Sequence, residues 1–266
     1  EIGSLTPGRR ADVILTSDLA SFPVETVIAR GDVVAEDGKC LVDCPHFDWP
    51  NTARQTVNMA RDLSADDFDI AAPEGANAVT ANVIGVVENQ APTRALKFEL
   101  PVTEGRVQGT GEVCQIALVE RHRATGTVTN AFVSGFGYEG RMAMASTVAH
   151  DSHHMIVVGT DAEQMALAAN RLREVGGGIT IFREGEELAL VALPIAGLMS
   201  DRPAAEVAAD AEALVQAMID CGCKLNNAYM QHSLLALVVI PELRISDLGL
   251  VDVQKFEIIP LLEPQT

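Results

Sequence analysis

The sequence predicts an α+β fold, in which short strands precede a layered α/β domain of mixed sheet and packed helices. Apolar residues make up 48% of the 266 positions, which is enough for a sizeable core. Alternating or β-branched apolar runs recur from Ala78 onward, which favours strands. Two segments with apolar residues at helical spacing interrupt these strands, and this order indicates helices layered on a sheet.

The first 45 residues are predicted to form short strands joined by turns. The strand candidates are Ala11–Thr16, Glu25–Ala29 and Val33–Ala35, and Gly31-Asp32 suits a hairpin turn between the last two. Three short strands cannot bury both faces of a sheet, so this segment needs partner strands from elsewhere.

Residues 46–77 are predicted to form a connector. Within it, Thr52–Leu63 can hold a short helix, Ser64-Ala65-Asp66-Asp67 can cap another, and Pro73-Glu74-Gly75 is a turn signal. Longer strands follow in residues 78–266. Their predicted ranges are Val79–Val87, Leu96–Leu100, Val113–Glu120, Thr127–Val133, Met142–Val148 and Met155–Val158.

The first predicted helix begins at a capping box, Thr160-Asp161-Ala162-Glu163, and ends at Gly176-Gly177-Gly178. A β-hairpin of Ile179–Phe182 and Leu188–Leu193 is expected next. The second helix begins near Asp201 or Pro203 and ends at Gly222. Two closing strands, Leu234–Ile240 and Leu250–Ile259, complete the predicted order.

Charge and cysteine content limit the classes of partner and location. The formal net charge of −18 disfavours nucleic acid and anionic membranes, and no apolar run approaches the roughly 18 residues of a membrane span. The five cysteines, Cys40, Cys44, Cys114, Cys221 and Cys223, lack a disulfide-scaffold rhythm, so we expect free thiols in a reducing cytoplasm. The absence of a starting Met and the unpartnered strands predict a truncated chain without a signal peptide.

The polar cluster His150-Asp151-Ser152-His153-His154 lies between two apolar runs and is the main candidate site. Such residues can supply metal ligands, a general base or hydrogen bonds to a polar ligand, although side chains on one turn need not converge. The motifs H-E-x-x-H and G-x-S-x-G, a Walker loop and the zinc nucleobase deaminase signature are absent. The other histidines, His46, His122 and His232, are scattered, and we expect His232 to be a near-core histidine with satisfied hydrogen bonds.

The opening segment, Gly3-Ser4-Leu5-Thr6-Pro7-Gly8-Arg9-Arg10-Ala11-Asp12-Val13-Ile14, resembles the trailing segment of amidohydrolase-superfamily enzymes, and Val27–Ala35 continues this resemblance. In that superfamily the segment follows the catalytic (β/α)8 barrel and returns the chain to a small β-sandwich. The resemblance therefore implies that residues 1–45 are the end of such a sandwich.

The remaining motifs resemble the C-terminal domain of bacterial adenine deaminases, over residues 78–266. They are Ser146–His154 with Ile156-Val157-Val158-Gly159, Gly176-Gly177-Gly178, Leu193–Ser200, Ile240-Pro241-Glu242-Leu243 and Gly249-Leu250-Val251-Asp252-Val253. Two departures are that His154 stands where the family pattern has Asn, and that Tyr229-Met230-Gln231-His232 is less apolar than the family version.

This resemblance implies part of a cytoplasmic hydrolase of purine salvage or adenine catabolism, in which a metal-bound hydroxide converts adenine to hypoxanthine and ammonia. The family's Mn²⁺ or Fe²⁺ ligands lie on the barrel, which this chain lacks, so we expect this chain to bind no metal and to be inactive alone. It would be a covering domain of a homo-oligomer. His150, Asp151, Ser152 and His153 are the candidates for residues near the substrate, and His150 and His153 are the weaker candidates for metal ligands.

Two alternatives remain open from the residues. The first is a stand-alone module that binds a purine or a metal through His150, Asp151 and His153 without chemistry, and calorimetric titration with adenine would detect it. The second is a separate metal-dependent hydrolase that uses the histidine cluster, for which metal analysis of His150→Ala and His153→Ala variants is the test.

Overall fold

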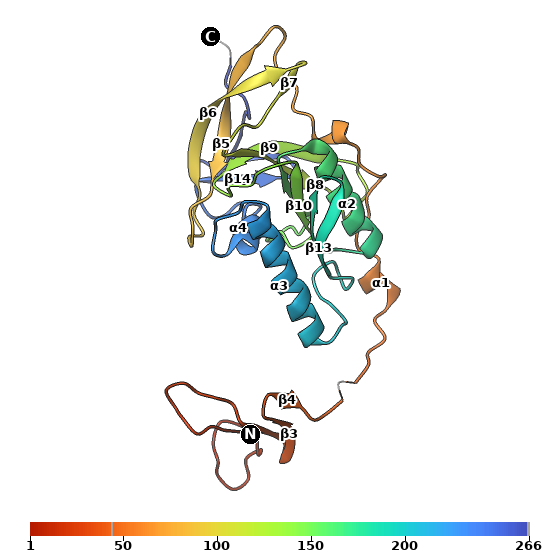
Figure 1. Cartoon of the computed structure of the whole chain (residues 1–266), viewed down its shortest axis with the longest axis vertical. Helices are drawn as coiled ribbons and strands as arrows, with labels where there is room; N and C mark the ends of the chain where they lie inside the picture. The colour runs from red at the N-terminus through yellow and green to blue at the C-terminus, as the bar shows by residue number, and fades with distance from the viewer. Residues whose placement is uncertain (44, 265–266) are drawn as a thin grey trace. The chain divides into compact units, whose positions relative to one another are not determined.

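The computed structural model describes residues 1–43 and 45–264 and confirms the predicted α+β fold. The chain divides into two compact units, Glu1–Asp48 and Trp49–Thr266 (Figure 1). Four of the cysteines, Cys40, Cys114, Cys221 and Cys223, are free thiols as expected, whereas Cys44 lies outside the described residues. No helix in the described part of the chain combines the length and the apolar character that crossing a membrane requires.

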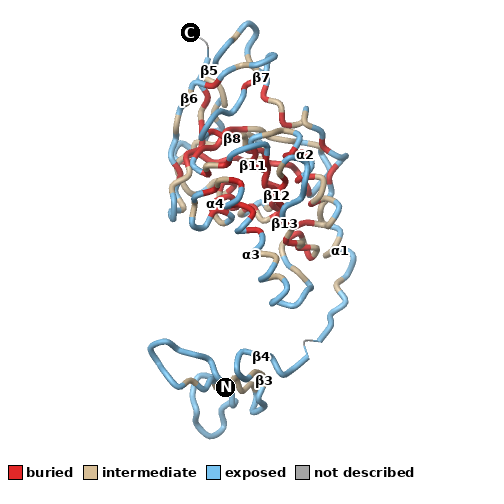
Figure 2. The backbone as a smooth tube through the Cα atoms, viewed as in Figure 1, coloured by how far each residue is buried: buried red, intermediate tan, exposed pale blue. Residues whose placement is uncertain are grey.

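The first unit is an antiparallel meander of four short strands, in the order β1 (Val13–Leu15), β2 (Thr26–Ala29), β3 (Asp32–Glu36) and β4 (Lys39–Cys40). The hairpin turn between β2 and β3 consists of Arg30 and Gly31, because Ala29 already pairs with Asp32. The prediction of Gly31-Asp32 was therefore one residue out of register. Both turn residues have positive φ, 55° and 94°, as tight hairpin turns require. None of the described residues in this unit is buried (Figure 2).

The segment from residue 46 to residue 77 contains a short helix, α1 (Asn51–Arg54), and a 3-10 helix, η1 (Ala65–Phe68). The short helix predicted within Thr52–Leu63 is present as α1, which ends at Arg54. The chain leaves the helix there because its backbone bonds to another segment: the amide of Asn58 donates to the carbonyl of Arg121 at 2.7 Å. Phe68 is completely buried against the second unit's helix-covered sheet face.

A nine-stranded sheet forms the centre of the second unit within the described residues, in the order β13-β12-β10-β11-β8-β9-β5-β6-β7. Its strands are β5 (Ala78–Gly85), β6 (Arg94–Thr103), β7 (Arg106–Val107), β8 (Val113–Val119), β9 (Val128–Ser134), β10 (Met142–Ser146), β11 (Met155–Gly159), β12 (Gly178–Arg183) and β13 (Glu186–Ala192). Only β5 and β9 pair in parallel. The strands predicted between residues 79 and 193 are confirmed.

Helices cover both faces of this sheet. Alternate residues of β8 belong to different cores: Ala117 and Val119 pack with α2 (Ala162–Val175), whereas Ile116 and Leu118 pack with α3 (Ala204–Asp220) and α4 (Ala228–Leu234). Both predicted helices are present, as α2 and α3. Buried residues concentrate where β8, β11 and β12 lie between these layers (Figure 2).

The C-terminal region differs most from the prediction. The expected strand Leu234–Ile240 is wrong, because α4 ends at Leu234 and turns follow, with Leu235 buried in the core. The second expected strand, Leu250–Ile259, is divided into a hairpin. The closing sheet contains β14 (Leu243–Ser246), β15 (Gly249–Asp252) and β16 (Glu257–Ile259), in that order.

Candidate functional site

The polar cluster forms the turn between β10 and β11, which pair antiparallel up to Ser146 and Ile156. Asp151 and Ser152 are exposed, His150 and His153 are half-buried, and His154 is buried. The rings of His150 and His153 meet edge to face, with their centroids 5.4 Å apart. We call residues 150–154 the histidine loop.

Backbone hydrogen bonds hold both ends of the histidine loop. The amide of His150 donates to the carbonyl of Ser233 on α4 at 3.0 Å, and the amide of His153 donates to the carbonyl of Ala149 at 2.6 Å. The amide of Ala149 also donates to Nδ1 of His153 at 3.3 Å. The neutral His153 ring therefore carries its proton on Nε2.

The residues that follow β8 complete the site, and sequence reasoning missed them. Nε2 of His122 donates to the carbonyl of Ser152 at 2.8 Å, and the rings of His122 and His154 lie 4.8 Å apart. His122 is therefore not isolated from the cluster, as its position in the sequence suggested. The signal that could have located it is strand pairing, because Val119 of β8 lies opposite Met155 of β11.

Glu120 fixes the turn that carries His122. Its buried carboxylate accepts hydrogen bonds from the amides of Arg123 and Thr125, at 2.8 and 2.9 Å, and also from the amide of His122. Burial raises the pKa of this carboxyl group, but the amides of Thr125, Arg123 and His122 outweigh it and lower the pKa to about 2. Glu120 is therefore ionised at neutral pH.

The buried histidines of the site favour their neutral forms. Burial lowers the pKa of His153, and the neighbouring His150 and Arg121 lower it further. Burial and then His122 lower the pKa of His154, although Asp247, whose Oδ2 is 3.9 Å from Nε2 of His154, acts in the opposite direction. Neutral imidazoles can donate and accept hydrogen bonds, so this cluster can interact with an uncharged polar ligand.

His150 and His153 are the candidate metal ligands of the histidine loop. No group of three or more His, Cys, Asp or Glu side chains in the described residues is arranged to hold an ion. Moreover, Nδ1 of His153 already accepts a hydrogen bond. The residues that the structure describes therefore do not fit a three-ligand catalytic metal site.

Two hollows flank the histidine loop and meet at Asp247. A small one of about 140 Å³ is lined by Asp151, Ser152 and the apolar turn 236–239. On the other side, a hollow of about 520 Å³ is lined by Glu120, His122 and His154 together with Leu248. Both are open at the surface, so the loop is presented between them.

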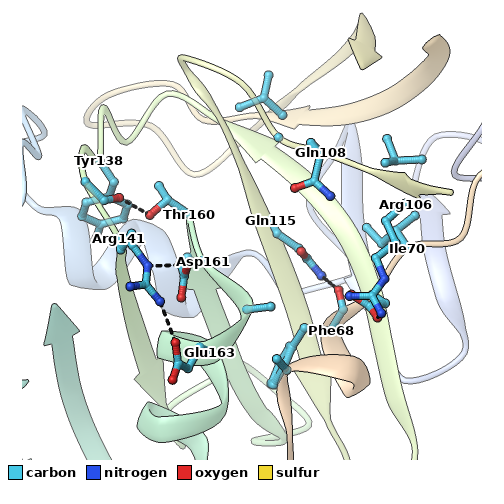
Figure 3. Close-up of a pocket in the computed structure, with 18 of the residues that line it drawn as sticks. Phe68, Ile70, Arg106, Gln108, Gln115, Tyr138, Arg141, Thr160, Asp161 and Glu163 are labelled. Carbon is cyan, nitrogen blue, oxygen red and sulfur yellow. Dashed lines mark hydrogen bonds and ion pairs between the residues drawn. The ribbon is translucent and has the colours of Figure 1, made fainter. Parts of the chain in front are cut away.

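A further hollow, of about 610 Å³, lies away from the histidine loop (Figure 3). Arg141 lies beside the first turn of α2 on one side of it and forms ion pairs with Asp161 and Glu163, at 2.9 and 2.6 Å. Arg106 forms an ion pair with Asp69 at 3.0 Å. Because both arginines already have acidic partners, this hollow is a weaker candidate for a ligand site.

His232 is buried in the core, as expected. Its hydrogen bonding differs from the expectation. Neither ring nitrogen has a hydrogen-bond partner of normal geometry among the described residues, and the backbone of Met144 is the one polar group that acts on the ring, so the expectation of a fully satisfied histidine is wrong. Its ring lies beside that of Phe136, with the centroids 6.2 Å apart. Burial lowers the pKa of His232 to about 3, which keeps the ring neutral.

Comparisons with known proteins agree with the motif resemblance. A family model described as the adenine deaminase C-terminal domain matches residues 90–257. Adenine deaminases of Roseobacter denitrificans, Paracoccus denitrificans and Moorella thermoacetica are 81%, 69% and 42% identical to the chain over 266, 262 and 264 residues. These matches cover 100%, 98% and 98% of the chain but 44% of each relative, so the chain spans less than half the length of these relatives.

Proposed function

Because this chain belongs to the adenine deaminase C-terminal domain family, we propose that it is the non-barrel, covering part of an adenine deaminase. In the proposed reaction, water replaces the amino group of adenine, which yields hypoxanthine and ammonia. The observation that supports a role for this part is the histidine loop, which exposes polar side chains between two hollows. This activity belongs to the full-length protein, and the isolated chain is expected to be inactive.

The metal required by the proposed reaction, Mn²⁺ or Fe²⁺, belongs in this proposal to the barrel that this chain lacks. The barrel and adenine are accordingly the proposed partners. We further propose that the full-length protein acts in the cytoplasm, in purine salvage or adenine catabolism, as a homo-oligomer.

The side chains of the histidine loop have the hydrogen-bonding groups that a purine edge requires. Adenine carries donors on its amino group and acceptors on its ring nitrogens. The exposed carboxylate of Asp151 can accept from a donor, and the hydroxyl of Ser152 can donate or accept. In the proposed arrangement the histidine loop covers the substrate, and such a cover also excludes water from the reacting centre.

Ammonia release by the full-length protein tests the proposed function. With Mn²⁺ and adenine it should produce hypoxanthine and ammonia in equal amounts, whereas the isolated chain should produce neither. Asp151→Asn should lower kcat/KM about tenfold, because a charged hydrogen-bond acceptor is lost. The control Asp37→Asn, at an exposed turn in the other unit, should leave kcat/KM unchanged.

Two results would contradict the proposal. The first is a full-length protein that binds metal but does not convert adenine. The second is turnover by the isolated chain, which would place the chemistry on its own residues. Micromolar binding of adenine by the isolated chain without turnover would instead favour the stand-alone binding module.

A further inference from the structure

Arg121 is a buried cation whose guanidinium binds no acid. It is 1% exposed, and no carboxylate among residues 1–43 and 45–264 contributes to its pKa. Burial lowers the pKa of Arg121 to about 10, so the side chain remains charged at neutral pH. Burying a charge without an opposite charge is costly, and such an arrangement persists only when hydrogen bonds satisfy the group.

The guanidinium of Arg121 donates hydrogen bonds to backbone carbonyls in three segments that are far apart in the sequence. Nε donates to the carbonyl of His153 at 2.6 Å, Nη1 to the carbonyl of Thr56 at 3.1 Å, and Nη2 to the carbonyl of Ala196 at 3.2 Å. Of these three bonds, the shortest is the one to the histidine loop.

The surrounding backbone is shaped to admit this side chain. A Cβ atom at Gly197 would lie 2.8 Å from Nη1 of Arg121, and Gly197 has a φ of 70°, which favours glycine. The carbonyl of Gly197 is in turn held by the hydroxyl of Thr147, at 2.6 Å. The absence of a side chain at Gly197 therefore leaves room for the guanidinium.

We propose that Arg121 is the positioning residue of the histidine loop: its guanidinium fixes the carbonyl of His153 and thereby the placement of His150, Asp151 and Ser152. The expected effect of Arg121 on catalysis rests on the function proposed above. Its effect on the placement of the loop does not depend on that function. A planar, permanently charged fork can hold three carbonyls in different directions, which the single ammonium of lysine cannot do with the same geometry.

The charge of Arg121 also acts on His153. The groups that affect this ring are His150 and Asp151 on its own loop, and Arg121 and His122 after β8. Of these, Arg121 lowers the pKa of His153 and Asp151 raises it. Removing the guanidinium charge should therefore raise the pKa of His153, whereas Arg121→Lys retains the charge and should change it less.

Arg244 provides a matched control. It is also 1% exposed, burial also lowers its pKa to about 10, and its guanidinium also binds three backbone carbonyls, those of Leu234, Ile240 and Ala91. None of these carbonyls belongs to the histidine loop, and Arg244 is not among the groups that shift His153. Arg244→Gln therefore reproduces the loss of a buried guanidinium without the loss of the loop contact.

The test uses the full-length protein carrying Arg121→Gln, Arg121→Lys or Arg244→Gln. Hydrogen–deuterium exchange over residues 152–156 should accelerate at least about tenfold in both Arg121 variants, because a charge-assisted hydrogen bond is lost, and less in Arg244→Gln. The ¹³C NMR titration of His153, identified with His153→Asn, should move to higher pH in Arg121→Gln, and by less in Arg121→Lys and Arg244→Gln. In the deaminase assay, kcat/KM should fall in both Arg121 variants.

Exchange and titration in Arg121→Gln that match those of Arg244→Gln would overturn the positioning role, whether or not the protein deaminates adenine. A wild-type protein without deaminase activity would instead contradict the proposed function, and the first two measurements would still decide the role of Arg121. If neither Arg121 variant folds, Arg121→His, whose ring keeps one N–H donor, replaces them in the same exchange experiment.

Discussion

Glu120, Arg121 and His122 follow one another at the end of β8, and each contacts a different part of the site. Glu120 binds the amides of its own turn, Arg121 binds the carbonyl of His153, and His122 binds the carbonyl of Ser152. The sequence predicted the histidine loop but not these three residues. No local motif marks them, because their place is set by the antiparallel register of β8 and β11.

At the residue scale, Glu120→Gln should destabilise the second unit in a pH-dependent way. The pKa of Glu120 is about 2 in the folded protein, below its ordinary value of 4.5, so its contribution to stability is present above pH 4.5 and is lost as the pH falls toward 2. At pH 7 the variant should lose about 2 kcal/mol, the typical value for hydrogen bonds to a charged group. Urea unfolding at pH 7 and at pH 3 tests this, and a difference that does not shrink in acid would contradict it.

His232→Leu should make the protein less sensitive to acid than the wild type, whereas Glu120→Gln should destabilise it at neutral pH. The pKa of His232 is about 3 in the folded protein, below its ordinary value of 6.5, so the unfolded chain binds a proton that the folded chain does not between these values. Wild-type stability should therefore decline as the pH falls below 6.5, by about 2 kcal/mol at pH 5. The variant lacks this loss, and thermal unfolding at pH 8 and pH 5 measures it. Equal acid sensitivity of both proteins would show that His232 is not the cause.

At the scale of elements, strands and helices were predicted correctly where the hydrophobic pattern extends over many residues. The prediction failed where an irregular segment supplies the buried apolar residues. The helices α2 and α3 and the strands from β5 to β13 carry sustained patterns and were predicted, except for the two-residue strand β7, which was missed. The run Leu234–Ile240 is apolar for a different reason: Leu235 and Ala236 fill the core from an irregular segment after α4. A short apolar run without periodicity does not distinguish these possibilities.

The residue predicted to cap α2 is also wrong, by one position. The sequence predicted a capping box with Thr160 as the cap, but the side chain of Asp161 accepts from the amide of Gln164 at 3.1 Å. The hydroxyl of Thr160 instead binds the carbonyl of Gly140. A tertiary contact therefore takes the residue that local pattern favoured, and its neighbour caps the helix.

Because Asp161 caps α2, its substitution by Ala should destabilise the protein more than its substitution by Asn. Asp161→Ala should cost about 1 kcal/mol of folding free energy, because the first turn of α2 loses its side-chain acceptor. Asp161→Asn keeps an effective cap and loses only the partly exposed ion pair with Arg141, so it should cost less than about 0.5 kcal/mol. Chemical denaturation of the two variants tests the order, and an Asn variant as unstable as the Ala variant would assign the effect to the ion pair.

At the scale of the whole molecule, burial is distributed unequally between the two units. Every buried residue in the described part of the chain lies in the second unit, where the three core clusters are found. The first unit has the apolar strand residues that were predicted, but Ile14 and Val33 are 50% and 46% exposed. A sheet of such short strands without a buried face is not stable by itself.

This distribution predicts that the second unit folds without the first. A protein of residues 49–266 should unfold cooperatively within a few degrees of the whole chain, because removing residues 1–48 removes no buried side chain among those described. The peptide 1–48 alone should lack a cooperative transition by circular dichroism. As a control, removal of residues 243–266 takes Leu243, Ile245 and Leu250 out of the core and should abolish folding or lower Tm by more than 10 °C, at about 2 to 4 °C per kcal/mol for a domain of this size. A 49–266 protein that fails to fold while 1–48 folds alone would reverse the assignment of the core.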